Sequence, residues 1–242
     1  MPNKCILTTI ALTLTLSLFS QENTDVKKYK NEIGIVFTDL ANGTGLLRYE
    51  RLLNNHFSVA LSAGYKTENG LISFRGIDAN SIKTNDFNYF GYKLIPEVRY
   101  YFKNTMIGSM DGFYVGAYVK YSDFKSDLNG TYVSEDNTNY DVEYDADFKV
   151  TSIGLMAGYK LRLSKRFFID FLIAGPGGGH YNFKLVQKKS LPTEFYEKLN
   201  NALSEYGIFD FINSDFEFKD VDLRSKFSTI SFRYGITVGY SF

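Results

Sequence analysis

The sequence has no tryptophan, a single cysteine and only four prolines. The cysteine, Cys5, precedes the first apolar run, whereas a lipoprotein cysteine would follow it. A chain that loses this leader has no disulfide and depends on hydrogen bonding and packing alone. Basic and acidic residues balance at 27 each, so no net charge favours nucleic acid as a partner. With two histidines the chain lacks the usual zinc ligands, and we expect no metal or cofactor.

Long hydrophobic runs are also scarce. The one clear run, 6–19, is about 14 residues long and is short of the roughly 20 that a membrane-spanning helix needs. Lys4 precedes it and the small residue Ser20 follows it. This pattern predicts a signal peptide over 1–20 and a single mature domain over 21–242. An uncleaved anchor is the alternative.

Aromatic residues are abundant, with 19 Tyr and 22 Phe, and they favour strands. The C-terminal segment FSTISFRYGITVGYSF shows the pattern best. Every even position from 230 to 242 is apolar, and the odd positions between them are small or polar. Such alternation indicates a strand with one apolar face.

Eight segments show this alternation. They are 32–38, 46–52, 56–65, 94–102, 112–121, 151–163, 167–173 and 227–242. A β-strand crosses a membrane with about 9–11 tilted residues, and only closed barrels leave no strand edge unpaired in lipid. The expected connections around 54–55 and 164–166 are short and 103–111 is moderate, while 66–86, 122–147 and 175–226 are long and 39–45 is short.

The sequence therefore predicts an all-β fold, an eight-stranded antiparallel up-and-down transmembrane β-barrel with long external loops. Short periplasmic turns and longer external loops are typical of outer-membrane barrels, which places both chain ends on the periplasmic side. A soluble sandwich or lipocalin-like barrel is the alternative, and it would turn the apolar face inward.

Two of the long connections have features of their own. Within 175–226, the stretch 190–207 predicts a helix in which Ser190 is the cap, Pro192 lies in the first turn and Gly207 ends it. The glycines of 175–179 are interpreted as a flexible strand exit and not as a phosphate-binding loop. The acidic stretch 127–147 of the connection 122–147 is interpreted as a solvated loop or protruding hairpin, with calcium binding as the alternative.

Charged residues fall on the face opposite the apolar one. The predicted inward set is Arg48, Glu50, Glu97, Arg99, Lys120, Lys160, Arg162, Asp170 and Arg233. Eight strands enclose a lumen that side chains can fill, and isolated charges there are costly, so we expect a paired network that plugs the lumen. A path for ions or substrates is the alternative.

Four stretches carry a resemblance to a known family: 49–65, 96–102, 164–177 and the closing YGITVGYSF of 234–242. The chain resembles a widespread family of small bacterial outer-membrane β-barrels of undefined function, similar in architecture to the OmpA transmembrane domain, OmpX and OmpW. The resemblance implies that Tyr234, Ile236, Val238, Tyr240 and Phe242 form the C-terminal signal read by the barrel-assembly machinery.

We therefore expect a monomer in the outer membrane of a Gram-negative bacterium. Its expected partners are outer-membrane lipid and lipopolysaccharide, the barrel-assembly machinery during insertion and an unidentified surface ligand, and its role is structural or interactive rather than enzymatic. The first alternative is a narrow pore for small solutes or hydrophobic molecules. The second is a lipid A acyl-modifying enzyme that uses His180, or His56 with Ser58.

Overall fold

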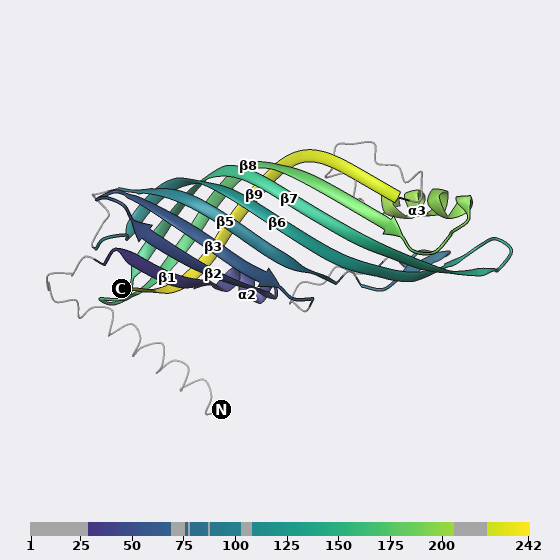
Figure 1. The fold of residues 1–242 in the computed structure, drawn as a ribbon, viewed down its shortest axis with the longest axis horizontal. Helices are drawn as coiled ribbons and strands as arrows, with labels where there is room; N and C mark the ends of the chain where they lie inside the picture. Colours follow the sequence, from purple (N-terminus) through teal and green to yellow (C-terminus); the bar gives the residue numbers. More distant parts are fainter. Residues whose placement is uncertain (1–28, 69–75, 77, 87, 103–107, 206–221) are drawn as a thin grey trace, which may run out of the picture.

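A computed structural model describes residues 29–68, 76, 78–86, 88–102, 108–205 and 222–242 (Figure 1). The predicted signal peptide 1–20 lies outside the described residues. The elements in chain order are β1 (Asn31–Val36), α2 (Phe37–Ala41), β2 (Thr44–Leu52), β3 (Phe57–Lys66), β4 (Ile82–Thr84), β5 (Tyr89–Tyr101), β6 (Gly112–Val133), β7 (Asn139–Arg162), β8 (Phe167–Gln187), α3 (Thr193–Glu205) and β9 (Asp222–Ser241).

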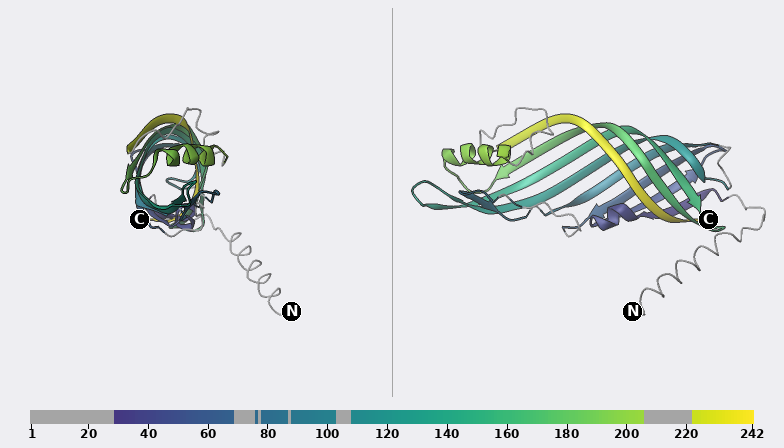
Figure 2. Two further views of the ribbon diagram at one scale, coloured as in Figure 1. Left: turned by 90° about the vertical axis from the view of Figure 1, so that its right-hand side faces the viewer. Right: turned by 180° about the vertical axis from the view of Figure 1, so that it is seen from behind.

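The sheet closes on itself through eight strands. Hydrogen-bonded antiparallel pairs run from β1 through β2, β3, β5, β6, β7, β8 and β9, and β9 pairs again with β1. The end-on view in Figure 2 shows this ring. The predicted number and antiparallel order of the eight alternating segments are therefore confirmed. A ninth strand, the short β4, was not predicted, and it pairs with β6 at Ile82 and Tyr132.

The ring forms because each strand alternates between two environments. In β9, Thr237 is 4% exposed and faces the interior, whereas its neighbour Val238 is 45% exposed and faces outward. Inward glycines make room for large inward side chains. A Cβ at Gly154 of β7 would lie 2.7 Å from the hydroxyl of Tyr118 of β6. The glycine therefore leaves room for the tyrosine side chain.

Four strands continue well past the ring. The distal sheet, as we name it, consists of β4 and residues 123–133 of β6, 139–149 of β7, 180–187 of β8 and 222–228 of β9 (Figure 1). The prediction of long connections at 122–147 and 175–226 was therefore wrong in part. The first connection is a tight turn over 134–138, where the Ser134 backbone N–H donates to the Thr138 carbonyl at 3.0 Å. Of the two interpretations of 127–147, the structure shows the hairpin, formed by β6 and β7.

The glycine stretch 175–179 is also a correction, because it lies inside β8 and is not a flexible strand exit. A register shift between Leu172 and Gly175 reverses the facing of β8. Asp170 and Leu172 face inward before the shift, and Gly175 and Gly179 are buried after it. His180 consequently faces outward.

The first predicted segment, 32–38, is wrong at its end. Phe37 and Thr38 belong to α2, a short helix that follows β1 directly. Gly43 follows α2 with φ 73°, a left-handed conformation that glycine adopts without strain, and its N–H donates to the Leu40 carbonyl at 2.9 Å. This cap turns the chain back into β2.

A second core lies under α3, separate from the ring interior. Phe195, Leu199 and Ala202 of α3 are buried against inward residues of the distal sheet, among them Tyr132 and Tyr144. The helix predicted over 190–207 is confirmed over Thr193–Glu205, although Pro192 precedes the first turn, and Gly207 lies outside the described residues. In the part of the chain that the structure describes, no helix is long and apolar enough to cross a membrane.

Candidate functional site: buried charges inside the ring

Glu50 of β2 is the centre of a charged cluster inside the ring. Its carboxylate lies 2.9 Å from Lys160 Nζ, 3.1 Å from Arg48 Nη2 and 3.5 Å from Arg99 Nη1. The other carboxylate oxygen accepts hydrogen bonds from the Ser58 hydroxyl at 2.6 Å and the Tyr101 hydroxyl at 2.7 Å. Three cations from three strands thus share one carboxylate.

Asp170 of β8, three strands from β2 around the ring, completes this cluster. Arg48 Nη1 lies 2.5 Å and Arg99 Nη1 2.7 Å from its carboxylate. The Tyr114 hydroxyl donates to the second oxygen at 2.8 Å. Arg99 also lies over the Tyr114 ring at 4.4 Å. Strands far apart in the sequence are therefore joined through charge-assisted bonds.

A second group of charges lies toward the end of the ring where β1 begins. Glu32 accepts from Lys160 at 2.5 Å and from Arg162 at 3.2 Å, and the Ser241 hydroxyl donates to it at 2.9 Å. Arg162 also pairs with Asp111 at 3.4 Å. This group links the first and last strands of the ring.

Glu97 holds the remaining paired arginine. Its Oε1 accepts from Arg233 Nη2 at 2.9 Å and its Oε2 from Arg99 Nη2 at 2.5 Å. Lys93 pairs with Asp39 of α2 nearby. Lys120 lines the same part of the ring, and within the described residues no carboxylate lies in ion-pair distance of it.

Sequence reasoning placed all nine charged residues on the inward face, and the structure brings eight of them into one network, all but Lys120. Sequence reasoning did not include Glu32 or Asp111. It placed Ser58 and Tyr101 inward without assigning them to the network. The alternation itself could have identified Glu32, because it precedes the outward Ile33. Asp111 lies just before β6, where no alternation signals its direction.

The network is buried inside the ring. The side chains of Arg99, Glu50 and Asp170 are each 1% exposed. Removing one partner of a buried pair leaves an uncompensated charge, so the loss of any one of these side chains is expected to destabilise the fold strongly. Across the described stretches of the chain, no three His, Cys, Asp or Glu side chains are grouped to hold a metal ion.

The histidines lie outside this network. His56 Nδ1 is 3.0 Å from the Tyr101 carbonyl, while Ser58 donates to Glu50, so these two side chains do not form the predicted pair. His180 Nδ1 lies 3.1 Å from Ser228 Oγ on the outer face of the sheet. Sequence reasoning found no serine for His180, because Ser228 is on another strand.

The C-terminal residues lie on the outer face of the ring. Tyr234, Ile236, Val238 and Phe242 are exposed and Tyr240 is partly exposed, on the side opposite Thr237 and Ser241. Phe167 packs edge-on against Tyr240 at 5.3 Å between ring centroids. These are the residues that the family resemblance assigns to the assembly signal.

Comparison with known proteins gives a family without a function. No curated protein and no solved structure matches the chain. The model of a protein family of unknown function, DUF3575, matches residues 8–207. Because that match covers most of the 242 residues, the chain belongs to the DUF3575 family.

Proposed function

We propose that the protein is an eight-stranded β-barrel of the bacterial outer membrane, closed inside by its charge network, which presents the distal sheet and α3 outside the membrane. The observation that carries this proposal is the reversed polarity of the ring. Its charged side chains are buried, and large apolar side chains on its outside are exposed. A ring in water would favour the opposite arrangement.

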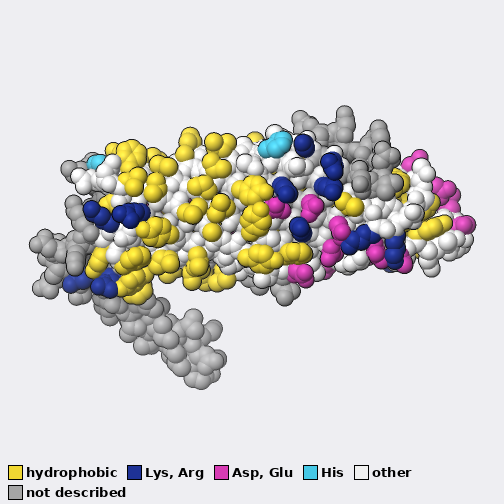
Figure 3. All heavy atoms as spheres, viewed as in Figure 1, with side chains coloured by type: hydrophobic (Ala, Val, Ile, Leu, Met, Phe, Trp, Pro, Cys, Tyr) yellow, Lys and Arg dark blue, Asp and Glu magenta, His cyan; other side chains and the backbone are white. Residues whose placement is uncertain are grey.

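The apolar outer face forms a band of limited height. On β6 the outward residues Phe113, Val115 and Val119 are exposed, and Asp123 begins the charged part of the same face. The band on this strand, 113–121, has about the 9–11 residues with which a tilted strand crosses the hydrocarbon. Figure 3 shows hydrophobic side chains over the ring and charged ones toward the distal sheet.

The upper edge of the band lies at the same register on four strands. Asp123 of β6 pairs with Lys149 of β7, which pairs with Asn182 of β8, which pairs with Lys226 of β9. All four side chains face outward. The change from apolar to polar residues on four neighbouring strands supports a membrane edge in this part of the sheet.

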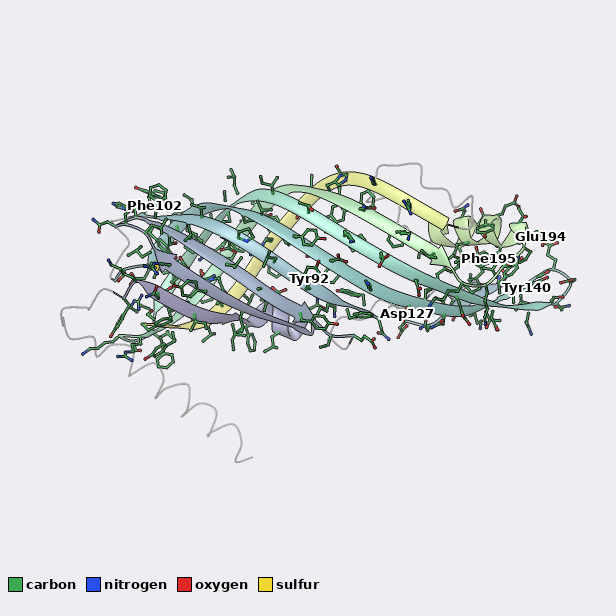
Figure 4. All side chains as sticks on the ribbon, viewed as in Figure 1. Tyr92, Phe102, Asp127, Tyr140, Glu194 and Phe195 are labelled. Carbon is green, nitrogen blue, oxygen red and sulfur yellow. The ribbon has the colours of Figure 1, made fainter. Side chains whose placement is uncertain are left out.

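Aromatic residues mark both edges of the band. Phe102 lies toward the end where the chain terminates, and Tyr92 lies near the middle of the molecule, as Figure 4 shows. Tyr65 and Tyr92 at the upper edge are both exposed. Amphipathic rings favour the membrane–water interface, which supports the same placement.

The distal sheet fits a role in surface interaction. It has its own apolar core beneath α3 and charged outer faces on β6 and β7. A rigid element of this kind, held by a plugged ring, favours contact with a partner outside the cell over conduction of solutes. The charged outer faces of β6 and β7, together with α3, would form the surface that contacts this partner.

Paired labels test the membrane position. A nitroxide on Val238→Cys is expected to show contact with lipid-soluble oxygen, and one on Thr237→Cys to show neither lipid nor free water, in outer membranes prepared from expressing cells. A folded barrel should also migrate faster before boiling than after it on a gel. Lipid contact at Thr237 and water at Val238 would overturn the proposal.

A second candidate function rests on the hydrogen bond between His180 Nδ1 and Ser228 Oγ, at 3.1 Å on the outer face. A serine beside a histidine is the pairing that nucleophilic acyl chemistry uses. An acyl-modifying enzyme predicts altered lipid A in an expressing strain, restored to the parental form by Ser228→Ala. Identical lipid A mass spectra with and without the protein would exclude it.

A further inference from the structure

A cavity lies inside the ring between the charge network and α2. Its volume is about 350 Å³, at the lower end of the roughly 300–1,000 Å³ of small-ligand pockets. Ile95 and Leu172 supply apolar lining, and Lys120 and Arg233 supply cationic lining. This mixed lining suits a ligand with a charged group and an apolar part.

The charges around the cavity do not balance. Its two acids are already engaged, because Asp39 pairs with Lys93 and both oxygens of Glu97 accept from arginines. Lys120 has no carboxylate in ion-pair distance among the described residues, and the buried Nη1 of Arg233 has no hydrogen-bond partner there. The partly buried Lys120 ammonium and the free Nη1 of Arg233 leave donors and positive charge that the lining carboxylates do not satisfy, so the site favours an anion.

The cavity reaches the wall of the ring between α2 and β9. In the described ranges, β9 pairs with β1 only from Thr237 onward and with β8 alone before it. Phe232 and Tyr234, both exposed on the outside, also line the cavity. An apolar chain can therefore extend from the charged interior toward the outer face.

We propose that this cavity binds a small single-chain anionic amphiphile, with its carboxylate at Lys120 Nζ and Arg233 Nη1 and its chain directed between α2 and β9. This goes beyond the surface role proposed above, and only the lateral route rests on the membrane position. The paired labels at Val238 and Thr237 test that position separately, so the two proposals fail independently.

Isothermal titration of the full barrel in zwitterionic lipid nanodiscs with sodium octanoate tests the site. We expect saturable binding at one site per chain. Sodium acetate, which lacks the chain, and 1-octanol, which lacks the charge, should each bind at least about tenfold more weakly. Absence of saturable octanoate binding, or equal affinity for acetate, would overturn the proposal.

Variants that change only charge locate the ligand. Lys120→Gln should weaken octanoate binding about tenfold or more, because a charge-assisted hydrogen bond is lost. Lys120→Arg should retain binding. Lys165→Gln, which removes the same charge from an exposed turn, is the matched control and should leave the affinity unchanged. If both variants keep the folded gel mobility and lose octanoate affinity equally, the ligand does not bind in this cavity.

Discussion

At the scale of single residues, Glu50 is the most highly connected carboxylate inside the ring. Its two oxygens receive three cations and two hydroxyls. The cost of removing such a group is dominated by the charges it leaves behind and not by the bonds it made. Stability inside the ring is therefore concentrated at a few acids.

Glu50→Gln is expected to lower the free energy of unfolding by about 3–5 kcal/mol, because Arg48, Arg99 and Lys160 lose a shared counter-charge. Urea unfolding in lipid vesicles, followed by far-UV circular dichroism, measures it. Glu135→Gln is the matched control, since Glu135 is 78% exposed and pairs with Lys198 at 3.2 Å. That change should cost less than about 1 kcal/mol. Equal shifts in the two variants would contradict the assignment of Glu50.

Asp136 gives a pH-dependent prediction at the tip of the distal hairpin. Hydrogen bonds from the Ser134 hydroxyl at 2.6 Å and the Thr138 backbone N–H at 3.1 Å hold the pKa of its carboxyl below 3.8. Because the pKa is lower in the folded turn, the turn's stabilisation is present above about pH 3.8 and is lost as the pH falls through the lowered value.

Hydrogen exchange of the Thr138 amide, corrected for the intrinsic rate at each pH, measures this effect. We expect protection at pH 5 to 6 that falls below pH 3.8. In Asp136→Asn the protection should no longer change over that interval, because the amide has no titrating group. A wild-type profile that is flat through this range would show that the carboxylate does not hold the turn.

At the scale of elements, α3 depends on the distal sheet for its stability. An isolated helix of 13 residues is marginal in water, so tertiary packing must hold it. Phe195 supplies that packing, with its ring 5.3 Å from the Tyr132 ring and 6.4 Å from the Tyr144 ring between centroids.

Phe195→Ala is expected to weaken docking of α3 by about 3–5 kcal/mol, since it empties a buried aromatic site. Limited proteolysis should then cleave α3 much faster than in wild type. The gel mobility of the unboiled protein should stay unchanged, because the ring keeps its contacts. Glu197→Ala on the exposed side of α3 is the control. Equal cleavage of both variants would contradict the packing described.

The elements also show how far sequence alone predicts this fold. Alternation located all eight ring strands, because a strand with one apolar and one polar face has period two. It did not locate residues 123–133 and 139–149, because there the contrast inverts: the inward face is apolar, as at Leu128 and Val142, and the outward face is charged. It failed again at the shift between Leu172 and Gly175, which reverses the facing without a signal in hydropathy.

The sequence predicts which residues belong to the candidate site, but not which of them pair with one another. Parity alone places Arg99 and Asp170 inward. Their contact at 2.7 Å depends on the register of strands 71 residues apart, which is fixed only when the ring closes. The cavity beneath α2 was not predictable at all, because α2 interrupts a segment whose alternation favours a continued strand.

At the scale of the whole molecule, the two ends of the ring differ in kind. At one end the start of β1, the end of β9 and the turn at 164–166 lie together, since the Asn31 N–H donates to the Phe242 carbonyl at 3.2 Å and the Ser241 N–H to the Arg166 carbonyl at 2.8 Å. At the other end the distal sheet projects with α3 (Figure 1). The proposed membrane position puts the first end in the periplasm and the second outside the cell.

Cysteine labelling distinguishes the two ends, because the chain's single natural cysteine is Cys5. Glu135→Cys, near the hairpin tip, should react with a membrane-impermeant maleimide on intact cells. Lys165→Cys, in the exposed turn at the opposite end, should react only after the outer membrane is permeabilised. Wild type gives the background from Cys5. Labelling of Lys165→Cys alone on intact cells would show the opposite orientation in the membrane. The distal sheet would then face the periplasm, where no surface partner could reach it.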